Sequence, residues 1–346
     1  MTVKLVHVGL GGWGTDWELN AFGPVEEIER VAWVDAHEPT LEKAQQRLKL
    51  PADRCFTSIE DAFSKVEADA LLVTAPQFAH VPLAIEAMGA GKHVLVEKPF
   101  AVSVDEAREG IAVAEKTGRI LMVSQQYRYY PAVRKAAELV ATQEYGPVGT
   151  VRVDFRKYAN TAAKASNRHY DFSHPLIYDM SIHHFDLMRL ILDREPARVY
   201  AQVTDPPWSK FNDEASAVLT IEFLDGLIVS YRGSWISPGS PTFWAGDWNI
   251  ETEGANIYFT SREGGEAGTS GDVVKVTPIG KKETMVNLDS PRVWGRSAGL
   301  VAFAEAIRSG EEPETSGRNN LGSIALMEAA ARAAASGKVE DVDQVR

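Results

Sequence analysis

Hydrophobic and polar positions follow two different rhythms along the chain. Up to about residue 124, short apolar runs that suit buried strands are separated by longer stretches with helical spacing. The apolar runs cover 3–8, 31–34, 70–74, 93–96 and 120–123, and the helical stretches cover 41–50, 81–88 and 104–115. Ser103 precedes the last stretch and is a candidate N-cap. Fully apolar strands that alternate with helices predict a parallel sheet covered on both faces.

The rhythm changes after residue 124. A helical pattern at 131–140 precedes runs of alternating apolar and polar residues at 148–155, 199–203 and 217–223, and a further strand-like run at 227–235. The Asp-Gly pair in "LDGL" (224–227) predicts a hairpin. An alanine-rich helical tail at 298–336 is interrupted around 310–317. We therefore expect an α/β domain over 1–124 and an α+β domain over 125–346 with a large, mainly antiparallel, open-faced sheet.

Composition narrows the class of protein. The chain has 346 residues, which suits two domains, and 48 acidic against 36 basic residues give a formal net charge of -12. This sign disfavours binding to nucleic acid or to a membrane surface. The single cysteine, Cys55, precludes an intrachain disulfide, fits a reducing compartment and is itself expected to be a small buried hydrophobe. Without a recognisable signal peptide or apolar span, we expect a cytoplasmic location.

A glycine-rich motif ends the first apolar run. Residues 9–14, Gly-Leu-Gly-Gly-Trp-Gly, satisfy G-x-G-x-x-G between a predicted strand and a predicted helix. This is the pyrophosphate-binding pattern of Rossmann domains, although glycines alone could form a flexible turn. Asp35 ends the next strand, 21 residues after Gly14, where a carboxylate accepts ribose hydroxyls and repels a 2′-phosphate. The pattern favours NAD over NADP; the alternative is that Asp35 is a solvated turn residue.

The stretch "TAPQFAHVPLAIEAMGAGKHVLVEKPFA" (74–101) resembles the glucose–fructose oxidoreductase / inositol dehydrogenase / MocA (GFO/IDH/MocA) family. The resemblance rests on a strand ending Thr-x-Pro, on His80 and on the tripeptide Glu97-Lys98-Pro99, and it implies that Lys98 lies beside the nicotinamide and the substrate. Lys98 also follows a buried strand, where open α/β sheets bind ligands. Glu97 either orients Lys98 or contacts the cofactor. The expected cofactor-binding residues are Gly9, Gly11, Gly12, Trp13, Gly14, Asp35, Thr74, Pro76, His80, Glu97 and Lys98.

The segment "YDMSIHHFDLMRL" (178–190) holds the candidate acid–base chemistry. On an α-helix Asp179 and His183 share a face, and a carboxylate beside an imidazole can fix its tautomer and raise its basicity. A surface pair and a metal cluster are the alternatives. His184 points roughly 100° away from His183 and suits packing.

The family pattern D-x-G-x-H-x-x-D is matched at Asp179, Ser181, His183 and Asp186. The resemblance implies a catalytic trio of Lys98, Asp179 and His183, with His183 as proton acceptor and no metal. Many relatives have a glycine-rich run before the aspartate. This chain has "DFSHPLIYD" there, which bears on the substrate rather than the chemistry.

Substrate residues are expected in two places. Tyr127 and Arg128 lie at the crossover between domains and either face the substrate or pack at a helix start. The polar stretch 157–170 offers Lys157, Asn167, Arg168 and His169 for hydroxyls or an acidic group. Four tryptophans of the second domain (Trp208, Trp235, Trp244 and Trp248) could stack on a sugar, although core or interface roles are the default.

These observations favour an NAD-dependent dehydrogenase of a sugar, cyclitol or related polyol. A family member that recycles bound NAD during glycoside cleavage or elimination, and a catalytically silent NAD-binding sensor, are the alternatives. By analogy with the family we expect a homodimer or homotetramer assembled through the C-terminal sheet.

Overall fold

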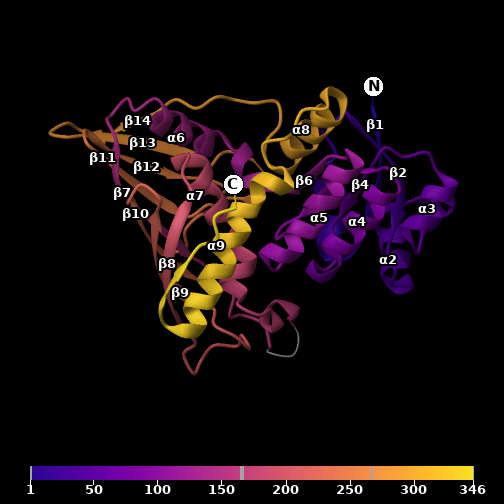
Figure 1. The fold of residues 1–346 in the computed structure, drawn as a ribbon, viewed down its shortest axis with the longest axis horizontal. Coiled ribbons are helices and arrows are strands. Elements are labelled where there is room, and N and C mark those ends of the chain that lie inside the picture. Colours follow the sequence, from indigo (N-terminus) through magenta and orange to yellow (C-terminus); the bar gives the residue numbers. More distant parts are fainter. Residues whose placement is uncertain (1, 164–166, 266–267, 346) are drawn as a thin grey trace. The chain divides into compact units, whose positions relative to one another are not determined.

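The computed structural model describes residues 2–163, 167–265 and 268–345 and divides the chain into two compact units (Figure 1). The first unit comprises Met1–Gln126 and Val293–Leu321, and the second comprises Tyr127–Arg292 and Gly322–Arg346. A late helical segment therefore belongs to the same unit as the N-terminal domain.

The first unit contains a six-stranded parallel sheet. Its order is β3-β2-β1-β4-β5-β6, and every pair of neighbours is parallel. The strands are β1 (Val3–Val8), β2 (Ile28–Val34), β3 (Cys55–Phe56), β4 (Ala70–Val73), β5 (His93–Glu97) and β6 (Leu121–Ser124). The four side chains of β4 are all buried, as a fully apolar run requires. The predicted parallel sheet is confirmed.

Helices of the first unit connect these strands. They are α1 (Gly12–Asn20), α2 (Glu38–Leu48), α3 (Ile59–Lys65), α4 (His80–Gly89) and α5 (Val104–Thr117). A later helix, α8 (Gly295–Ser309), belongs to the same unit. Ser103 caps α5 as predicted, because its side chain accepts a hydrogen bond from the Glu106 N–H at 3.2 Å. The half-buried Cys55 starts the short edge strand β3.

The second unit contains a nine-stranded sheet in the order β14-β13-β12-β11-β7-β10-β9-β8-β15. All pairs are antiparallel except β7 and β10, which run parallel. The strands are β7 (Val148–Arg156), β8 (Pro196–Thr204), β9 (Ser216–Phe223), β10 (Ile228–Ser234), β11 (Asp247–Thr252), β12 (Ala255–Thr260), β13 (Val273–Pro278), β14 (Thr284–Met285) and β15 (Val339–Asp341). The mainly antiparallel sheet and the β9–β10 hairpin are confirmed, while the sequence indicated neither β11–β15 nor the parallel pair.

Helices cover one face of this second sheet. They are α6 (Pro131–Ala141), α7 (Ile182–Leu192) and the part of α9 (Gly317–Ser336) that belongs to the second unit. Helix α6 packs against β12, β13 and α7. Side chains along β9 and β10 alternate between buried and more exposed, so the opposite face of these strands is open.

The segment that carries Asp179 departs from the expected α-helix. Residues Pro175–Ser181 form a π-helical turn, and the α-helix begins only at Ile182. The Trp235 indole N–H donates to the Pro175 carbonyl oxygen at 3.1 Å, and His174 before it has a left-handed backbone (φ 45°). The stretch from Asp179 to His183 is therefore π-helical up to Ser181 and α-helical from Ile182.

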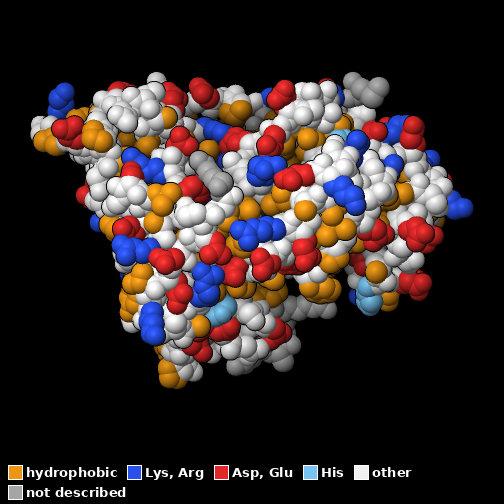
Figure 2. All heavy atoms as spheres, viewed as in Figure 1, with side chains coloured by type: hydrophobic (Ala, Val, Ile, Leu, Met, Phe, Trp, Pro, Cys, Tyr) orange, Lys and Arg blue, Asp and Glu red, His pale blue; other side chains and the backbone are white. Residues whose placement is uncertain are grey.

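None of the helices in the described ranges is long and apolar enough to cross a membrane. Figure 2 shows acidic and basic side chains interspersed over the visible surface.

Candidate active site

Two glycines of the 9–14 turn are required by backbone packing. Gly9 has a φ of +94°, and a Cβ there would lie 2.3 Å from the Ala75 nitrogen. A Cβ on Gly14 would lie 1.8 Å from the Gly9 carbonyl oxygen. The Thr74 hydroxyl donates to that same oxygen at 2.6 Å, which ties the turn to the end of β4. The two positions therefore hold the turn tightly against the sheet.

The other two glycines face open space. A Cβ on Gly11 or Gly12 would meet no atom within 4 Å. Gly11 is the N-cap of α1 and supplies no side-chain cap, and the first helical turn has no acidic residue. The amide groups at this helix start suit an anion, so the turn fits the pyrophosphate of a dinucleotide. The geometry is that expected of G-x-G-x-x-G.

Asp35 lies just beyond β2, next to this turn. Its Oδ2 accepts a hydrogen bond from the Leu10 N–H at 2.8 Å, and its Oδ1 accepts one from the His37 N–H at 2.9 Å. The carboxylate is thus fixed at the same sheet edge as the glycine cradle, which suits an acceptor for ribose hydroxyls.

The Glu97-Lys98-Pro99 segment ends β5 and is held from two sides. Glu97 is buried; its Oε1 accepts from the Trp17 indole N–H at 2.8 Å, and its Oε2 accepts from the Lys98 backbone N–H at 3.0 Å. Of the two roles considered for Glu97, this geometry favours orienting Lys98. The peptide bond between Lys98 and Pro99 is cis.

His80 bridges the ends of β4 and β5. Its buried ring lies 2.9 Å from both the Ala75 and the Pro99 carbonyl oxygens, and each carbonyl can only accept. Burial lowers the pKa of His80, while the two carbonyl oxygens favour the protonated ring. Pro76 lies in the loop that this contact fixes.

Trp13 of the glycine turn is covered by an arginine that the sequence did not indicate. The buried Arg296 guanidinium, at the start of α8, lies 4.6 Å from the Trp13 ring centroid and 5.2 Å from that of Trp17. It also forms an ion pair with Asp16 at 2.6 Å. Trp13 and Arg296 lie far apart in the chain, so no local sequence pattern predicts their contact.

In the second unit, His183 is packed into a stack of planar groups. Its ring lies parallel to that of Tyr127, with centroids 4.0 Å apart and planes 6° from parallel. The Arg262 guanidinium lies 3.9 Å from the Tyr127 centroid. Because two groups at this distance cannot share one face, Tyr127 separates the imidazole from the guanidinium. His183 and Tyr127 are both buried, so the orientation of the imidazole is fixed.

Asp179 is bonded to a residue of the predicted substrate stretch. The His169 Nε2–H donates to Asp179 Oδ2 at 3.0 Å. Three aromatic rings (Phe172, Phe211 and Trp235) pack edge-on against His169 at 5.0 to 5.5 Å. Asn167 accepts from the His169 backbone N–H at 3.1 Å. The stretch 157–170 thus positions the candidate catalytic carboxylate, and the side chain of Arg168 lies outside the described part of the chain.

Arg128 forms a buried ion pair. Its Nε and Nη2 donate to Asp186 Oδ2 and Oδ1 at 2.6 and 2.7 Å, and both side chains are buried. The Ser323 hydroxyl donates to the same carboxylate at 3.2 Å. This geometry favours the packing role of Arg128 over a substrate-facing one.

His184 lies in the core. Its fully buried ring donates to the Trp244 carbonyl oxygen at 3.3 Å and accepts from the Tyr231 hydroxyl at 3.0 Å. Burial lowers the pKa of His184 to about 4, which keeps the ring neutral at pH 7. The packing role expected for His184 agrees with this position.

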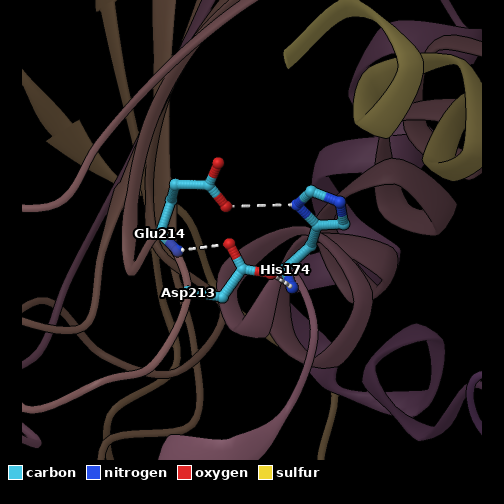
Figure 3. Close-up of side chains that lie close together, drawn as sticks. All are labelled: His174, Asp213 and Glu214. Atoms are coloured by element: carbon cyan, nitrogen blue, oxygen red, sulfur yellow. Dashed lines mark hydrogen bonds and ion pairs between the residues drawn. The ribbon is translucent and has the colours of Figure 1, made fainter. Parts of the chain in front are cut away.

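Among the described residues, one group has metal-ligand geometry: His174, Asp213 and Glu214 (Figure 3). The His174 Nδ1 lies 3.3 Å from a Glu214 oxygen, and Asp213 accepts from the backbone N–H groups of both neighbours at 3.0 and 2.9 Å. These contacts tie the residue before the π-helical turn to the segment that carries Asp213 and Glu214.

The four tryptophans that the sequence offers for stacking on a sugar differ in burial. Trp248 is fully buried and stacks on Phe259 with centroids 5.1 Å apart, and Trp235 is buried beside His169. Trp208 is exposed. Trp244 is half-buried, with the Lys157 ammonium 4.6 Å from its ring centroid. Trp235 and Trp248 therefore take core positions, and Trp208 and Trp244 keep part of their rings exposed.

The parallel sheet, the open glycine cradle and the acid that follows β2 define a protein with an N-terminal dinucleotide-binding domain. Residues 3–125 match the model of an oxidoreductase family with an NAD-binding Rossmann fold, and residues 133–255 match the GFO/IDH/MocA C-terminal domain. The chain belongs to the GFO/IDH/MocA family of oxidoreductases.

Relatives of the chain are named as carbohydrate enzymes. The D-xylose 1-dehydrogenase (NADP(+)) 2 of Haloferax volcanii is 27% identical over 320 residues, 92% of this chain and 93% of that protein. The 1,5-anhydro-D-fructose reductase of Ensifer adhaerens is 24% identical over 298 residues, 84% of each chain. The structure of aldose-aldose oxidoreductase from Caulobacter crescentus, complexed with glycerol, aligns with a TM-score of 0.85 at 21% identity, over 99% of this chain and 100% of that one. This structural likeness shows the shared fold.

Proposed function

We propose that the protein is an NAD-dependent dehydrogenase that interconverts a hydroxyl and a ketone on a sugar, cyclitol or related polyol. Family membership supports the nicotinamide cofactor, and the relatives named for D-xylose and 1,5-anhydro-D-fructose support the substrate class. One observation carries the proposal. At the carboxyl edge of the first sheet, an open anion cradle follows β1, and Lys98, with its backbone fixed by Glu97, follows β5.

The proposed chemistry combines a hydride transfer with a proton transfer. When bound, the nicotinamide supplies the hydride acceptor at its C4. A ring nitrogen of His183 takes the hydroxyl proton while the carbon–hydrogen bond breaks with its electron pair and a carbon–oxygen double bond forms. The Lys98 ammonium donates a hydrogen bond to the reacting oxygen and stabilises its developing negative charge. Asp179, which accepts from the His169 ring at 3.0 Å, is the carboxylate proposed to support His183 as the proton acceptor.

We further propose that NAD is preferred to NADP. The Asp35 carboxylate is fixed beside the glycine turn by the Leu10 and His37 N–H groups. A fixed negative charge there repels a 2′-phosphate and accepts hydrogen bonds from a ribose 2′-hydroxyl. One relative is named as an NADP(+) enzyme, so the preference is a property to be measured on this chain.

The test is a spectrophotometric screen in which NAD and NADP are each offered with a panel of sugars and polyols. We expect NADH formation with at least one of them, and a fall in kcat of about 10²–10⁴-fold in His183→Ala. His93→Ala is the matched control, because His93 begins β5 and so lies at the opposite end of that strand from Lys98. The absence of NADH with every panel member would contradict the proposal. Product without NADH would indicate a recycled cofactor, and binding without turnover would indicate a sensor.

Assembly through the open face of the second sheet is also proposed. Val218 and Ile228, on β9 and β10, remain exposed at 52% and 37%. Exposed apolar side chains on an open sheet face suit an interface between copies of the chain. Light scattering on the wild-type protein and on Val218→Glu tests this: we expect a dimer or tetramer that the charge weakens, and a wild-type monomer would contradict it.

A further inference from the structure

Lys157 is a half-buried cation without a carboxylate partner in the described part of the chain. It directly follows β7, and its backbone is fixed on both sides: its N–H donates to Ser234 at 2.9 Å, and its carbonyl accepts from Ser237 at 3.1 Å. The protein carries 48 acidic residues, yet among the described residues none forms an ion pair or hydrogen bond with this ammonium. The ammonium lies over the Trp244 ring, 4.6 Å from its centroid.

Lys275 also lies near an aromatic ring, but unlike Lys157 it has a carboxylate partner among the described residues. Lys275 lies 5.8 Å from the Tyr258 ring centroid and also forms an ion pair with Glu283 at 3.0 Å.

Burial and the nearby positive charge of Arg262 lower the pKa of Lys157. Arg262 is itself buried. The Trp244 N–H donates to the Arg262 carbonyl oxygen at 3.4 Å, so Arg262 lies beside the tryptophan that Lys157 covers. Asp272 offsets part of the Arg262 charge, because its Oδ1 accepts from the Arg262 backbone N–H at 3.4 Å. Lys157 and Arg262 together still make a locally positive region, and an anion beside Lys157 would stabilise it.

This positive region borders the candidate catalytic residues. Arg262 lies on one face of Tyr127, and His183 lies on the other. Trp244, under Lys157, packs against Trp235 with centroids 6.1 Å apart. Trp235 packs in turn against His169, the residue that donates to Asp179. All of these residues belong to the second unit. One aromatic ring therefore separates Arg262 from His183, and the two tryptophans and His169 link Lys157 to Asp179.

We propose that Lys157 and Arg262 form a subsite for an anionic group of the substrate, so that the enzyme acts on a sugar that carries a carboxylate or a phosphate. The inference rests on the proposed dehydrogenase function and narrows its substrate class. The Lys157 ammonium pairs with the anion as a compact charge, and the Trp244 ring beside it presents an apolar face to the sugar ring. Carboxylate and phosphate share this chemistry, and the two are distinguished by experiment.

The first test compares matched pairs of sugars with NAD. D-glucuronate, D-galacturonate and glucose 6-phosphate are each compared with the neutral parent sugar. We expect at least one anionic sugar to have a kcat/KM about 10- to 100-fold above its parent, with most of the difference in KM. The uronate pairs report a carboxylate site, and the phosphate pair reports a phosphate site. Lys157→Met should lower that ratio about 10- to 100-fold, and Lys157→Arg should retain most of it. Lys275→Met, the matched control, should leave the ratio unchanged.

The second test is independent of turnover. Binding of the same three anionic sugars to the protein with NADH present is measured by isothermal titration calorimetry, for wild type, Lys157→Met and Lys275→Met. We expect binding that Lys157→Met weakens and Lys275→Met does not. A wild-type protein that oxidises neutral sugars and neither prefers nor binds any anionic one would overturn the subsite while the dehydrogenase function stands. Binding that Lys157→Met leaves intact would also overturn it. Anion binding that requires Lys157, without oxidation of any sugar, would support the subsite and count against the dehydrogenase.

Discussion

Two alanine substitutions in the glycine turn separate its packing role from its role as an anion cradle. A Cβ on Gly14 would lie 1.8 Å from the Gly9 oxygen, and this separation must open to at least 3.0 Å. Gly14→Ala should therefore shift the turn and destabilise the first unit by about 1–3 kcal/mol. A Cβ on Gly11 meets nothing within 4 Å, and the Gly11 φ of -59° suits alanine. Gly11→Ala should fold normally, yet its methyl group occupies the approach to the N-terminus of α1.

We expect Gly11→Ala to raise the dissociation constant for NADH about 10- to 100-fold, which corresponds to about 1.4–2.8 kcal/mol. Binding is measured by isothermal titration calorimetry, and stability by urea unfolding of the same samples. Gly89→Ala is the control, because Gly89 lies in α4 of the same unit and also faces open space. If Gly11→Ala binds NADH as tightly as wild type, the pyrophosphate does not lie on this turn and the reasoning is refuted.

Three further predictions concern the buried His184, the ion pair of Arg128 with Asp186, and the Asp35 carboxylate. Because the pKa of His184 is about 4 when folded and 6.5 when unfolded, the unfolded chain binds a proton first as the pH falls, and stability should fall by about 3 kcal/mol between pH 6.5 and 4. NMR titration of the imidazole signals checks this, and a His184 midpoint near 6.5 would contradict it. Arg128→Met leaves the buried Asp186 carboxylate without its cation and should lower the free energy of unfolding by about 3–5 kcal/mol, measured by denaturant unfolding. Adding Asp186→Asn to the same chain should restore part of that stability. An Arg128→Met protein as stable as wild type would refute the buried ion pair. Asp35→Ser should raise the ratio of NADP to NAD efficiency about tenfold or more, and an unchanged ratio would remove the argument for NAD.

Features set by short stretches of sequence could be predicted. The strand ending at Val8 is a run of β-branched and apolar residues followed by glycines, and the helix after Ser103 begins with an N-cap that needs only its own first turn. The glycine motif is local in part: a Cβ on Gly14 would meet the Gly9 carbonyl oxygen within the same turn, whereas a Cβ on Gly9 would meet Ala75 after β4. The first strand, the N-cap and the Gly14 contact are each set by residues that lie close together in the chain.

Features that depend on contacts between residues far apart in the chain could not be predicted from the sequence. The parallel pairing of β7 with β10 joins Thr150 to Ile228, and nothing in either segment specifies that partner. The π-helical turn that contains Asp179 has a partner sixty residues downstream, because the Trp235 indole N–H donates to the Pro175 carbonyl oxygen. Arg262 lies in a glycine-rich loop whose sequence indicates no chemistry, and its place over Tyr127 is a tertiary contact. Its role in the site emerges only from the folded chain.

The central claim, hydride transfer to NAD, is tested most directly by isotope labelling. The sugar found to be oxidised is supplied with deuterium on its carbinol carbon, and the nucleotide is analysed by mass spectrometry after turnover with wild type and with His183→Ala. We expect the deuterium of the wild-type reaction to accumulate at C4 of the reduced nucleotide, and His183→Ala to transfer it about 10²–10⁴-fold more slowly. Deuterium that appears in water or returns to the product, with none retained in the nucleotide, would contradict it.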